Sequence, residues 1–434
     1  MRDMARRTFL GAAVAAAAAN LAAAQEGAGS PPARIGIIGT GSRGQSLLGT
    51  LLSLPSVDVP AVCDVDPAAA DAAAALLAAA GRPAPEKYTG GPEDYRRLLA
   101  RDDLDAVIIA TPWDSHAAMA VDTMRAGKYA GVEVPAALTV DECWALVNTS
   151  AETGVPCMML ENWSFRRDNL ALLQMRRAGL FGHPVHAHCA YAHDCVEWFC
   201  TPDGKQSWRG AFLEKRNCDQ YPTHSLGPVL SWLDIGCGDM FASLTSTATG
   251  AFGINAHFAR KQGPDHPNAA RKIMQGDVVT TVIRTHGGKT IVVNNDMTLP
   301  RPYDNRWVLQ GTLGIYDQHR TSVYLEGRSP VSHEWEPFEP YEKEFDHPWW
   351  REMGEAALQA GHAGTDYLVL AFFAKAVREK SAPPLDACDA ALMSCVVGLS
   401  EQSIARGSAP VECPDFTKGA WKTRKPYFGV VEGA

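Results

Sequence analysis

The sequence predicts an α/β fold whose N-terminal part is a doubly wound parallel sheet. Strand-like and helical segments alternate from residue 34 to about residue 160, which is the order of β-α-β units. A glycine-rich turn joins the first strand to the first helix. The chain has 434 residues, 46% of them apolar and 21% charged, which suffices for a large core and favours two domains over one.

The predicted strands are short apolar runs that end at turn residues or polar positions. They cover residues 35–38, 57–63, 106–110, 130–133 and 157–160. The segments between them have helical periodicity and cover residues 45–54, 67–80, 92–100, 115–126 and 140–153. Because a helix separates each strand from the next, we expect the strands to be parallel and the helices to cover both faces.

The glycine-rich turn has Gly39, Gly41 and Gly44 in the spacing Gly-x-Gly-x-x-Gly. Glycines so placed allow a tight turn and let the backbone approach a pyrophosphate at the helix N-terminus. Asp64 follows Gly44 by 20 residues, at a strand end where a carboxylate binds a ribose 2′-hydroxyl. The sequence therefore predicts a dinucleotide site that prefers NAD. Arg43 leaves NADP as the alternative cofactor, since an arginine beside this turn can bind a 2′-phosphate.

Two further strand ends are expected to line the dinucleotide. Trp113 and His116 follow the third predicted strand, and Glu133 and Val134 lie at the end of the fourth. Ligands bind in such sheets at the edge where the carboxyl ends of the strands meet. For His116 a second interpretation stays open, in which the ring only packs at the start of a helix.

The N-terminus is predicted to be a twin-arginine type signal peptide and linker over residues 1–32. Arg6 and Arg7 precede an alanine-rich, weakly apolar stretch, and Ala22-Ala23-Ala24 offers a cleavage site. This pattern predicts export of the folded protein to the periplasm or the exterior. A cytoplasmic protein with an alanine-rich tail is the alternative.

Composition limits the partners. The net charge of −9 argues against nucleic acid or an anionic membrane. The eleven cysteines include no Cys-x-x-Cys pair, and no metal site is predicted. Cys189, Cys195, Cys200 and Cys218 lie close together and are candidates for one disulfide.

Polar side chains of the second part suggest chemistry on a small molecule. Tyr191 and His193 share one face of a strand predicted over residues 185–195. His224 follows a proline at a predicted helix start, where a neutral imidazole is suited to act as a general base. For Tyr191 and His193 the alternative is a buried hydrogen-bonded pair without a chemical role.

The first part resembles the Gfo/Idh/MocA oxidoreductase family. The resemblance implies a Rossmann dinucleotide-binding domain over residues 33–160 and an α+β domain with an open, mainly antiparallel sheet over residues 161–434. In that family the strand at Glu133 carries Glu-Lys-Pro, and the lysine assists deprotonation of a substrate hydroxyl. This chain has Glu133-Val134-Pro135 instead, which weighs against an ordinary dehydrogenase.

The second part resembles glycoside hydrolase family 109, whose NAD-dependent members are known for α-N-acetylgalactosaminidase activity and also carry Glu-Val-Pro. The matching motifs are Met159-Leu-Glu161-Asn162-Trp163, Arg176-x-Ala-Gly179-Leu-Phe-Gly182, Tyr191-Ala-His193-Asp194, Trp208-Arg209, Tyr221-Pro-Thr-His224-Ser-Leu-Gly227-Pro228 and Leu299-Pro-Arg301-Pro-Tyr303. Two segments depart from the family. Trp113-Asp114-Ser115-His116 stands where Trp-Glu-Trp-His is typical, and the segment around residues 196–207 is divergent, with Cys195 and Val196 after Tyr191-Ala-His193-Asp194. The chemistry is therefore safer to transfer than the sugar specificity.

The resemblance implies hydrolysis of a terminal sugar through a redox cycle. Hydride leaves C3 of the sugar, the C2 proton and the C1 oxygen are eliminated, water adds, and the hydride returns, so that tightly bound NAD is recycled. The partner is then a glycoside or glycan terminus, and the open sheet suggests a homo-oligomer. His224 is expected to deprotonate the C3 hydroxyl. Tyr191, polarised by His193, is expected to remove the C2 proton or to protonate the leaving group.

The residues assigned to binding form two sets. The sugar is expected to contact Tyr191, Arg209, Tyr221, His224 and Tyr303. NAD is expected to contact Gly39, Gly41, Ser42, Arg43, Gly44, Asp64, Trp113, His116, Glu133, Val134 and Asn162.

Two other functions stay open. A net NAD-dependent sugar or cyclitol dehydrogenase would accumulate NADH and a keto product. A sugar-binding protein that retains NAD as a structural element would bind its ligand without converting it.

Overall fold

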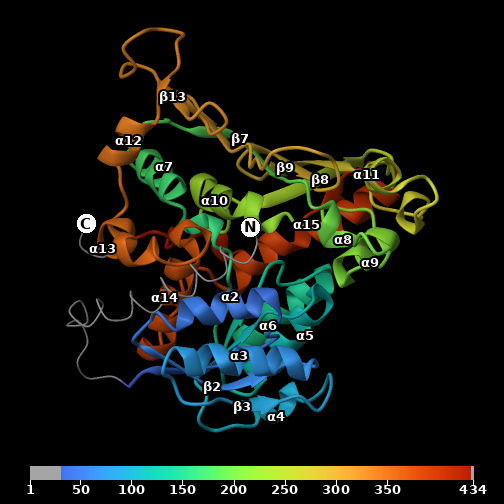
Figure 1. The fold of residues 1–434 in the computed structure, drawn as a ribbon. Coiled ribbons are helices and arrows are strands. Elements are labelled where there is room, and N and C mark those ends of the chain that lie inside the picture. The colour runs from blue at the N-terminus through green and yellow to red at the C-terminus, as the bar shows by residue number, and fades with distance from the viewer. Residues whose placement is uncertain (1–30, 432–434) are drawn as a thin grey trace.

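The computed structural model describes residues 31–431, and its first sheet is parallel with the strand order β3-β2-β1-β4-β5-β6 (Figure 1). The predicted signal peptide therefore lies outside the described residues, apart from the linker residues Pro31 and Pro32. The six strands are β1 (Ala33–Ile38), β2 (Val57–Cys63), β3 (Glu86–Tyr88), β4 (Ala106–Ile109), β5 (Tyr129–Val132) and β6 (Cys157–Met159). This order confirms the predicted doubly wound fold.

The edge strand β3 was missed by the sequence prediction. It has three residues, two of them exposed, and it follows the proline-containing run Arg82-Pro83-Ala84-Pro85, so it shows no apolar pattern. The strand pairs with the end of β2, and the backbone N–H of Asp64 donates to the carbonyl of Tyr88 at 3.1 Å. The short strand therefore helps to fix the predicted ribose-binding carboxylate.

Helices cover both faces of the first sheet, as expected (Figure 1). They are α2 (Ser42–Leu51), α3 (Pro67–Ala79), α4 (Tyr95–Leu99), α5 (Trp113–Arg125) and α6 (Val140–Thr153). A helix from far downstream, α14 (Thr365–Glu379), also packs against α2 and β1. The C-terminal part of the chain therefore contributes to the cofactor-binding half.

The second sheet has nine strands in the order β14-β13-β12-β11-β7-β10-β9-β8-β15. They are β7 (Pro184–Ala192), β8 (Phe241–Ala248), β9 (Val278–Thr285), β10 (Thr290–Asp296), β11 (Val308–Gly311), β12 (Gly314–Asp317), β13 (Ser322–Leu325), β14 (Glu336–Pro337) and β15 (Val411–Glu412). Only β7 and β10 pair in parallel; the other described pairs are antiparallel. The expected open, mainly antiparallel sheet is confirmed.

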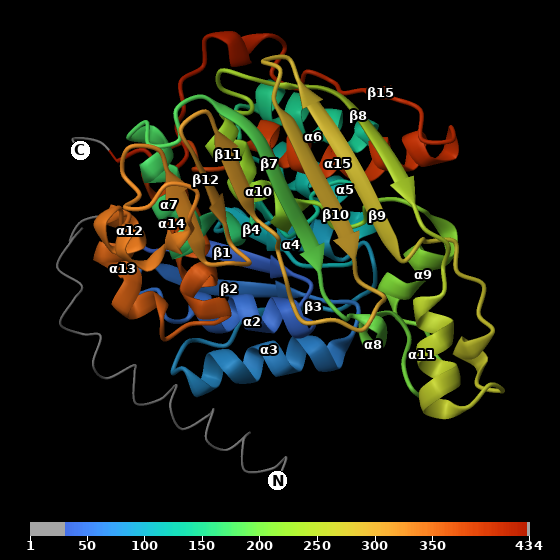
Figure 2. The same cartoon turned by 90° about the horizontal axis from the view of Figure 1, so that it is seen from above.

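One face of the second sheet is uncovered in Figure 2, and helices lie behind the other face. Helix α15 lies between the two sheets, because it packs against α6 on one side and β8 on the other. Helix α10 packs against β7 and carries His224 in its first turn. The helices after the first sheet are α7 (Arg167–Arg177), α8 (Val196–Phe199), α9 (Trp208–Lys215), α10 (Thr223–Leu233), α11 (Gly253–Gln262), α12 (Glu339–Glu344), α13 (Pro348–Ala357), α14 and α15 (Ala387–Ala405).

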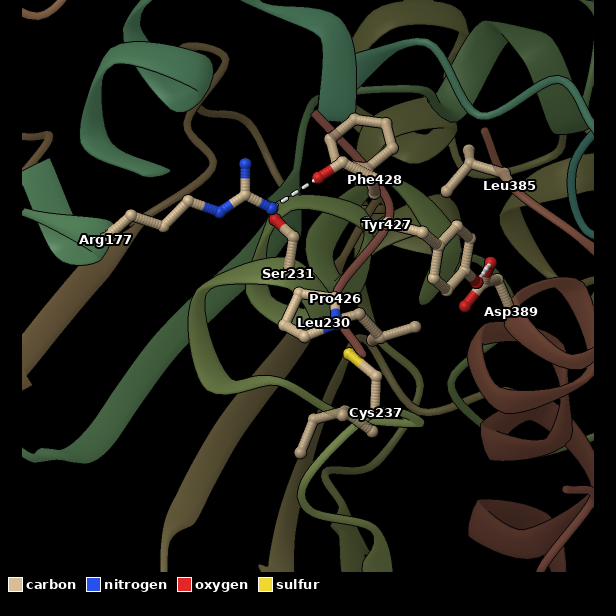
Figure 3. Close-up of a pocket in the computed structure, with 11 residues that line it drawn as sticks. Arg177, Leu230, Ser231, Cys237, Leu385, Asp389, Pro426, Tyr427 and Phe428 are labelled. Carbon is tan, nitrogen blue, oxygen red and sulfur yellow. Dashed lines mark hydrogen bonds between the residues drawn. The ribbon is translucent and has the colours of Figure 1, made fainter. Parts of the chain in front are cut away.

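The C-terminal segment, residues 427–429, binds both α7 and α15 (Figure 3). Arg177 of α7 donates to the backbone carbonyls of Phe428 and Gly429 at 2.6 and 2.5 Å. Tyr427 donates its hydroxyl to Asp389 of α15. The segment also lines a pocket together with Leu230 of α10.

All eleven cysteines are free thiols, so the expected disulfide among Cys189, Cys195, Cys200 and Cys218 is wrong. These four side chains are buried and fill the core as small apolar groups. Within residues 31–431, no helix is long and apolar enough to cross a membrane.

A buried carboxyl group links the chain before α10 to the second sheet. Asp219 accepts from Asn295 of β10 at 3.1 Å and from the backbone N–H of Tyr221 at 3.3 Å. Its second oxygen has no partner among the described residues. Burial raises the pKa of Asp219 to about 6, because an unpaired carboxylate is poorly solvated in the interior.

Replacing Asp219 by Asn should stabilise the protein in a pH-dependent way. Ionising the buried Asp219 lowers the free energy of unfolding. This loss of stability is absent below about pH 4, grows between pH 4 and 6, and is complete above that range. We expect D219N to gain about 3 kcal/mol at pH 8 and almost nothing at pH 4. Denaturant unfolding at both pH values measures this, with the exposed Asp265→Asn as the control. An equal gain at both pH values would contradict the assignment.

Candidate active site

The glycine-rich turn has the geometry that a dinucleotide requires. Gly39 has φ +87°, and a Cβ there would lie 2.7 Å from the backbone carbonyl of Ala110. A Cβ at Gly44 would lie 1.9 Å from the oxygen of Gly39. At Gly41, by contrast, no atom of the described residues lies within 4 Å of an added Cβ. The first and last glycines thus form the turn, and the middle one leaves open space beside the backbone.

The N-terminus of α2 opens into that space. Gly41 is its N-cap, and no side chain in the described part of the chain caps the helix. Its first residue, Ser42, is exposed. Uncapped N–H groups at the positive end of a ten-residue helix are suited to bind a pyrophosphate.

Asp64 is held in position at the end of β2. One oxygen accepts from the backbone N–H of Thr40 at 2.6 Å, and the other accepts from the N–H of Asp66 at 2.9 Å. These bonds place a fixed carboxylate next to the turn, where the sequence predicted a ribose contact.

Arg43 is clamped between two carboxylates. Its guanidinium lies 2.7 Å from Glu133 and 2.7 Å from Asp366, which was not singled out from the sequence. Burial alone would lower the pKa of Arg43, but the two carboxylates raise it above its ordinary value. Its charge is therefore already compensated, which removes the main argument for a 2′-phosphate and favours NAD.

Asp366 is the centre of this cluster. It is fully buried on the first turn of α14, and it also accepts from Asn162 at 2.8 Å and from His362 at 2.7 Å. Burial would raise the pKa of Asp366, but His362 and Arg43 hold it well below the usual range. The amide nitrogen of Asn162 makes the bond to Asp366, and its amide oxygen Oδ1 is buried without a partner in residues 31–431. An orphaned acceptor at the carboxyl edge of the sheet fits a ligand that donates hydrogen bonds, such as a nicotinamide amide.

Trp113 and His116 make protein contacts instead of facing open space. Both ring nitrogens of His116 lie 2.8 Å from backbone carbonyls, those of Pro135 and Thr111, and burial lowers its pKa. His116 thus joins the loops after β4 and β5, which favours the packing interpretation that the sequence left open. Trp113 is 4% exposed and packs on Trp208, with ring centroids 5.1 Å apart.

The residues predicted to act on the sugar gather around α10. His224 donates from Nδ1 to Glu161 at 2.8 Å. Because a carboxylate only accepts, the proton lies on Nδ1 and Nε2 is free to take another. Glu161 is fully buried and also accepts from the backbone N–H groups of Trp163 and Ser164, each at 2.8 Å. The carboxylate is therefore fixed, and it fixes the imidazole.

Gly227 allows this pairing. An added Cβ at Gly227, one turn after His224 on α10, would lie 2.1 Å from Oε2 of Glu161. Only a glycine lets the buried carboxylate approach the helix so closely. This contact explains the glycine of the Tyr-Pro-Thr-His-Ser-Leu-Gly-Pro motif.

Tyr191 lies at the centre of the aromatic side chains. Its ring centroid is 4.8 Å from that of Tyr221, 5.6 Å from that of His224 and 5.9 Å from that of Tyr303. Burial, reinforced by Tyr221, raises the pKa of Tyr191 well above its ordinary value. The phenol therefore keeps its proton at neutral pH.

His193 does not hydrogen-bond to Tyr191, so the expected direct polarisation is absent. Its Nδ1 lies 2.9 Å from Sγ of Cys195, and its ring centroid is 6.4 Å from that of Tyr191. Burial lowers the pKa of His193 below its ordinary value, so the imidazole is neutral at pH 7.

Arg209 supplies a positive charge to this region. Its guanidinium lies 4.1 Å from the ring centroid of Trp208, and no carboxylate in the described residues pairs with it. An unpaired guanidinium next to aromatic rings is suited to bind the oxygens of a ligand.

Sequence reasoning missed two buried carboxylates, Glu161 and Asp366. Glu161 directly precedes Asn162 at the end of a predicted strand, and this position could have revealed it. Asp366 had only a weaker signal, as a carboxylate in the first turn of an apolar helix. The described residues contain no group of three or more potential metal ligands.

Two family models match the chain and together span most of it. "Oxidoreductase family, NAD-binding Rossmann fold" matches residues 33–161, and "Glycosyl hydrolase 109, C-terminal domain" matches residues 165–423. The N-terminal part is thus an NAD-binding Rossmann domain of the Gfo/Idh/MocA class.

Full-length similarity identifies the family within that class. A glycosyl hydrolase family 109 protein of Stenotrophomonas maltophilia is 39% identical, over 99% of both chains. An alpha-N-acetylgalactosaminidase of Tannerella forsythia is 40% identical, over 92% of this chain and 89% of that one. The chain belongs to glycosyl hydrolase family 109.

Solved structures share the fold at lower identity. An oxidoreductase domain protein from Kribbella flavida has a TM-score of 0.68 at 21% identity, over 89% of this chain and 100% of that one. Levoglucosan dehydrogenase in complex with NADH has a TM-score of 0.65 at 20% identity, over 88% of this chain and 100% of that one. At these identities the likeness concerns the fold alone.

Gly41→Ala tests the cofactor site with a matched control. No described atom lies within 4 Å of an added Cβ at Gly41 or at the exposed Gly49 of the same helix. Both variants should therefore fold, but only the methyl group at Gly41 intrudes where the pyrophosphate is expected. We expect Gly41→Ala to weaken NAD binding at least ~10-fold and Gly49→Ala to leave it unchanged, as measured by calorimetry. Equal NAD affinities for the two variants would contradict the placement.

Proposed function

We propose that this protein is a glycoside hydrolase that removes a terminal sugar by a redox cycle with no net oxidation. The observation that carries the proposal is the Glu161–His224 pair, which lies beside the cofactor-binding edge and faces Tyr191. The position where a dehydrogenase of this class carries its lysine is the buried Val134. Proton transfer at the sugar therefore depends on His224 and its neighbours.

NAD is the cofactor that the residues fit, through the open space at Gly41, the uncapped helix α2 and the orphaned oxygen of Asn162. When bound, NAD⁺ supplies a reversible hydride acceptor for C3 of the sugar. We propose that it stays bound through the cycle, which suits a protein that uses its cofactor without an external supply.

His224 and Glu161 act on the hydroxyl at C3. Nε2 of His224 accepts the hydroxyl proton, and the fixed carboxylate of Glu161 stabilises the imidazolium that results. The same pair returns the proton at the end of the cycle. Glu161 is a positioning residue, because it acts through His224 and is fully buried.

Tyr191 and His193 divide the remaining proton transfers. Once C3 is a ketone, the proton at C2 is acidic and the bond from C1 to the leaving oxygen can break. Because Tyr191 keeps its proton, it is available to protonate that oxygen, and because His193 is neutral, one of its ring nitrogens is available to accept the C2 proton.

Arg209, Tyr221 and Tyr303 hold the sugar. The unpaired guanidinium of Arg209 is suited to a carbonyl or hydroxyl oxygen, such as that of an N-acetyl group. We propose α-linked N-acetylgalactosamine as the first substrate to try, because it is the substrate in the name of the relative from Tannerella forsythia. This proposal rests on similarity, and the Trp113-Asp114-Ser115-His116 departure makes other sugars worth testing.

We also propose that the protein is exported through the twin-arginine route, which would carry folded protein with NAD already bound. The support is Arg6-Arg7 with the alanine-rich stretch that follows. Replacing both arginines by lysine should retain the protein in the cytoplasm, as shown by fractionation of cells.

The proposed function is tested with purified protein and no added cofactor, on methyl α- and β-glycosides that include N-acetylgalactosamine. We expect release of free sugar with no change in absorbance at the NADH wavelength. Stoichiometric NADH with a keto sugar would instead establish the dehydrogenase. Binding without any product would establish the sugar-binding protein.

Replacing Glu161 by Gln tests the positioning role. The amide keeps the size but loses the charge that stabilises the imidazolium of His224, so kcat should fall about a hundred-fold with KM and NAD content unchanged. Glu214→Gln, which removes a carboxylate paired with Arg271, is the control. In a His224→Ala background, Glu161→Gln should cause no further loss. An additional loss there would mean that Glu161 acts independently of His224.

A further inference from the structure

A row of aromatic rings runs from the catalytic residues to the surface. The centroid of Tyr303 lies 5.9 Å from that of Tyr191 and 5.1 Å from that of His193. The centroid of His193 lies 5.3 Å from that of Trp198 on α8. Tyr191 at the inner end of the row is 7% exposed, His193 is half-buried, and Tyr303 and Trp198 are 40% and 52% exposed. The row therefore leads outward from the reacting position.

Trp198 is presented by a fixed segment. Val196 and Phe199 of α8 are each 1% exposed, so this short helix is anchored on both sides of Trp198. The backbone N–H of Trp198 donates to Cys195 at 2.8 Å, and its carbonyl accepts from the hydroxyl of Ser207. About half of the surface of Trp198 is thus exposed to solvent, although hydrogen bonds fix the backbone of this residue.

Polar groups lie beside the indole. Glu197, next to Trp198, forms an ion pair with Lys261 of α11 at 3.4 Å, and both side chains are more than half exposed. A flat apolar face with exposed charged groups at its side matches a pyranose ring, which has one apolar face and a rim of hydroxyls. A protein partner would instead be expected to need a larger continuous apolar patch.

We propose that Trp198, which lies beyond the cleaved-sugar residue Tyr303, forms a subsite for the sugar to which the cleaved sugar is attached. This inference rests on the proposed function. In the proposed reaction, the C3 carbon of the cleaved sugar must face the cofactor edge. The leaving group on C1 then points away from that edge and along the aromatic row. The enzyme would then recognise a disaccharide or a longer glycan end, with the second ring stacked on Trp198.

The test compares two substrates that share the cleaved sugar, a methyl glycoside and an oligosaccharide. Trp198→Ala should lower kcat/KM for the oligosaccharide about ten-fold, mainly through KM, and leave the methyl glycoside unchanged. Trp198→Tyr should restore most of the loss. Trp335→Ala, at another exposed tryptophan (40%), is the control and should change neither substrate.

Two outcomes would overturn the subsite, namely an equal loss on both substrates or no loss on either. A binding measurement distinguishes a failure of the subsite from a failure of the proposed function. Titration of the protein loaded with NAD should show tighter binding of the oligosaccharide than of the free sugar, and Trp198→Ala should abolish the difference, whatever reaction follows. If the oligosaccharide gains no affinity over the free sugar in the unaltered protein, the subsite is refuted even where hydrolysis is observed.

Discussion

A carboxylate buried in a protein is costly unless it is paired, and two paired carboxylates hold this site together. Glu161 satisfies its oxygens with two backbone N–H groups and His224, and Asp366 satisfies its own with Arg43, Asn162 and His362. Each joins a loop of the first sheet to a helix from the second half of the chain. The cofactor edge and the sugar-binding residues are therefore fixed relative to one another by electrostatics as well as by packing.

This arrangement separates the protein from a dehydrogenase that shares its fold. In such an enzyme a lysine beside the cofactor assists oxidation, and the product leaves as a ketone. In this protein Val134 occupies that position, and the surrounding side chains are a fixed histidine, a protonated phenol and a neutral second histidine. Such a set suits a sequence of proton transfers within one bound sugar, which is what elimination and water addition require.

The sequence predicted the first sheet well because glycine spacing and buried apolar runs are local signals. It missed β3, which is too short and too exposed to show a pattern. It left His116 between a cofactor contact and packing, because the backbone carbonyls that lie 2.8 Å from its two ring nitrogens are revealed by no local pattern. Glu161 and Asp366 were missed because their partners lie 63 and 323 residues away, so their role depends on the tertiary fold. The ring distances around Tyr191 likewise required the second sheet.

The most direct test of the account is hydrolysis in D₂O followed by NMR, without added cofactor. If the sugar passes through a C3 ketone, a residue removes the C2 proton and solvent replaces it, so the released sugar should carry deuterium at C2. Hydrolysis with no deuterium at C2 would mean a direct displacement at C1. That result would contradict the redox cycle and the proposed roles of His224, Tyr191 and His193.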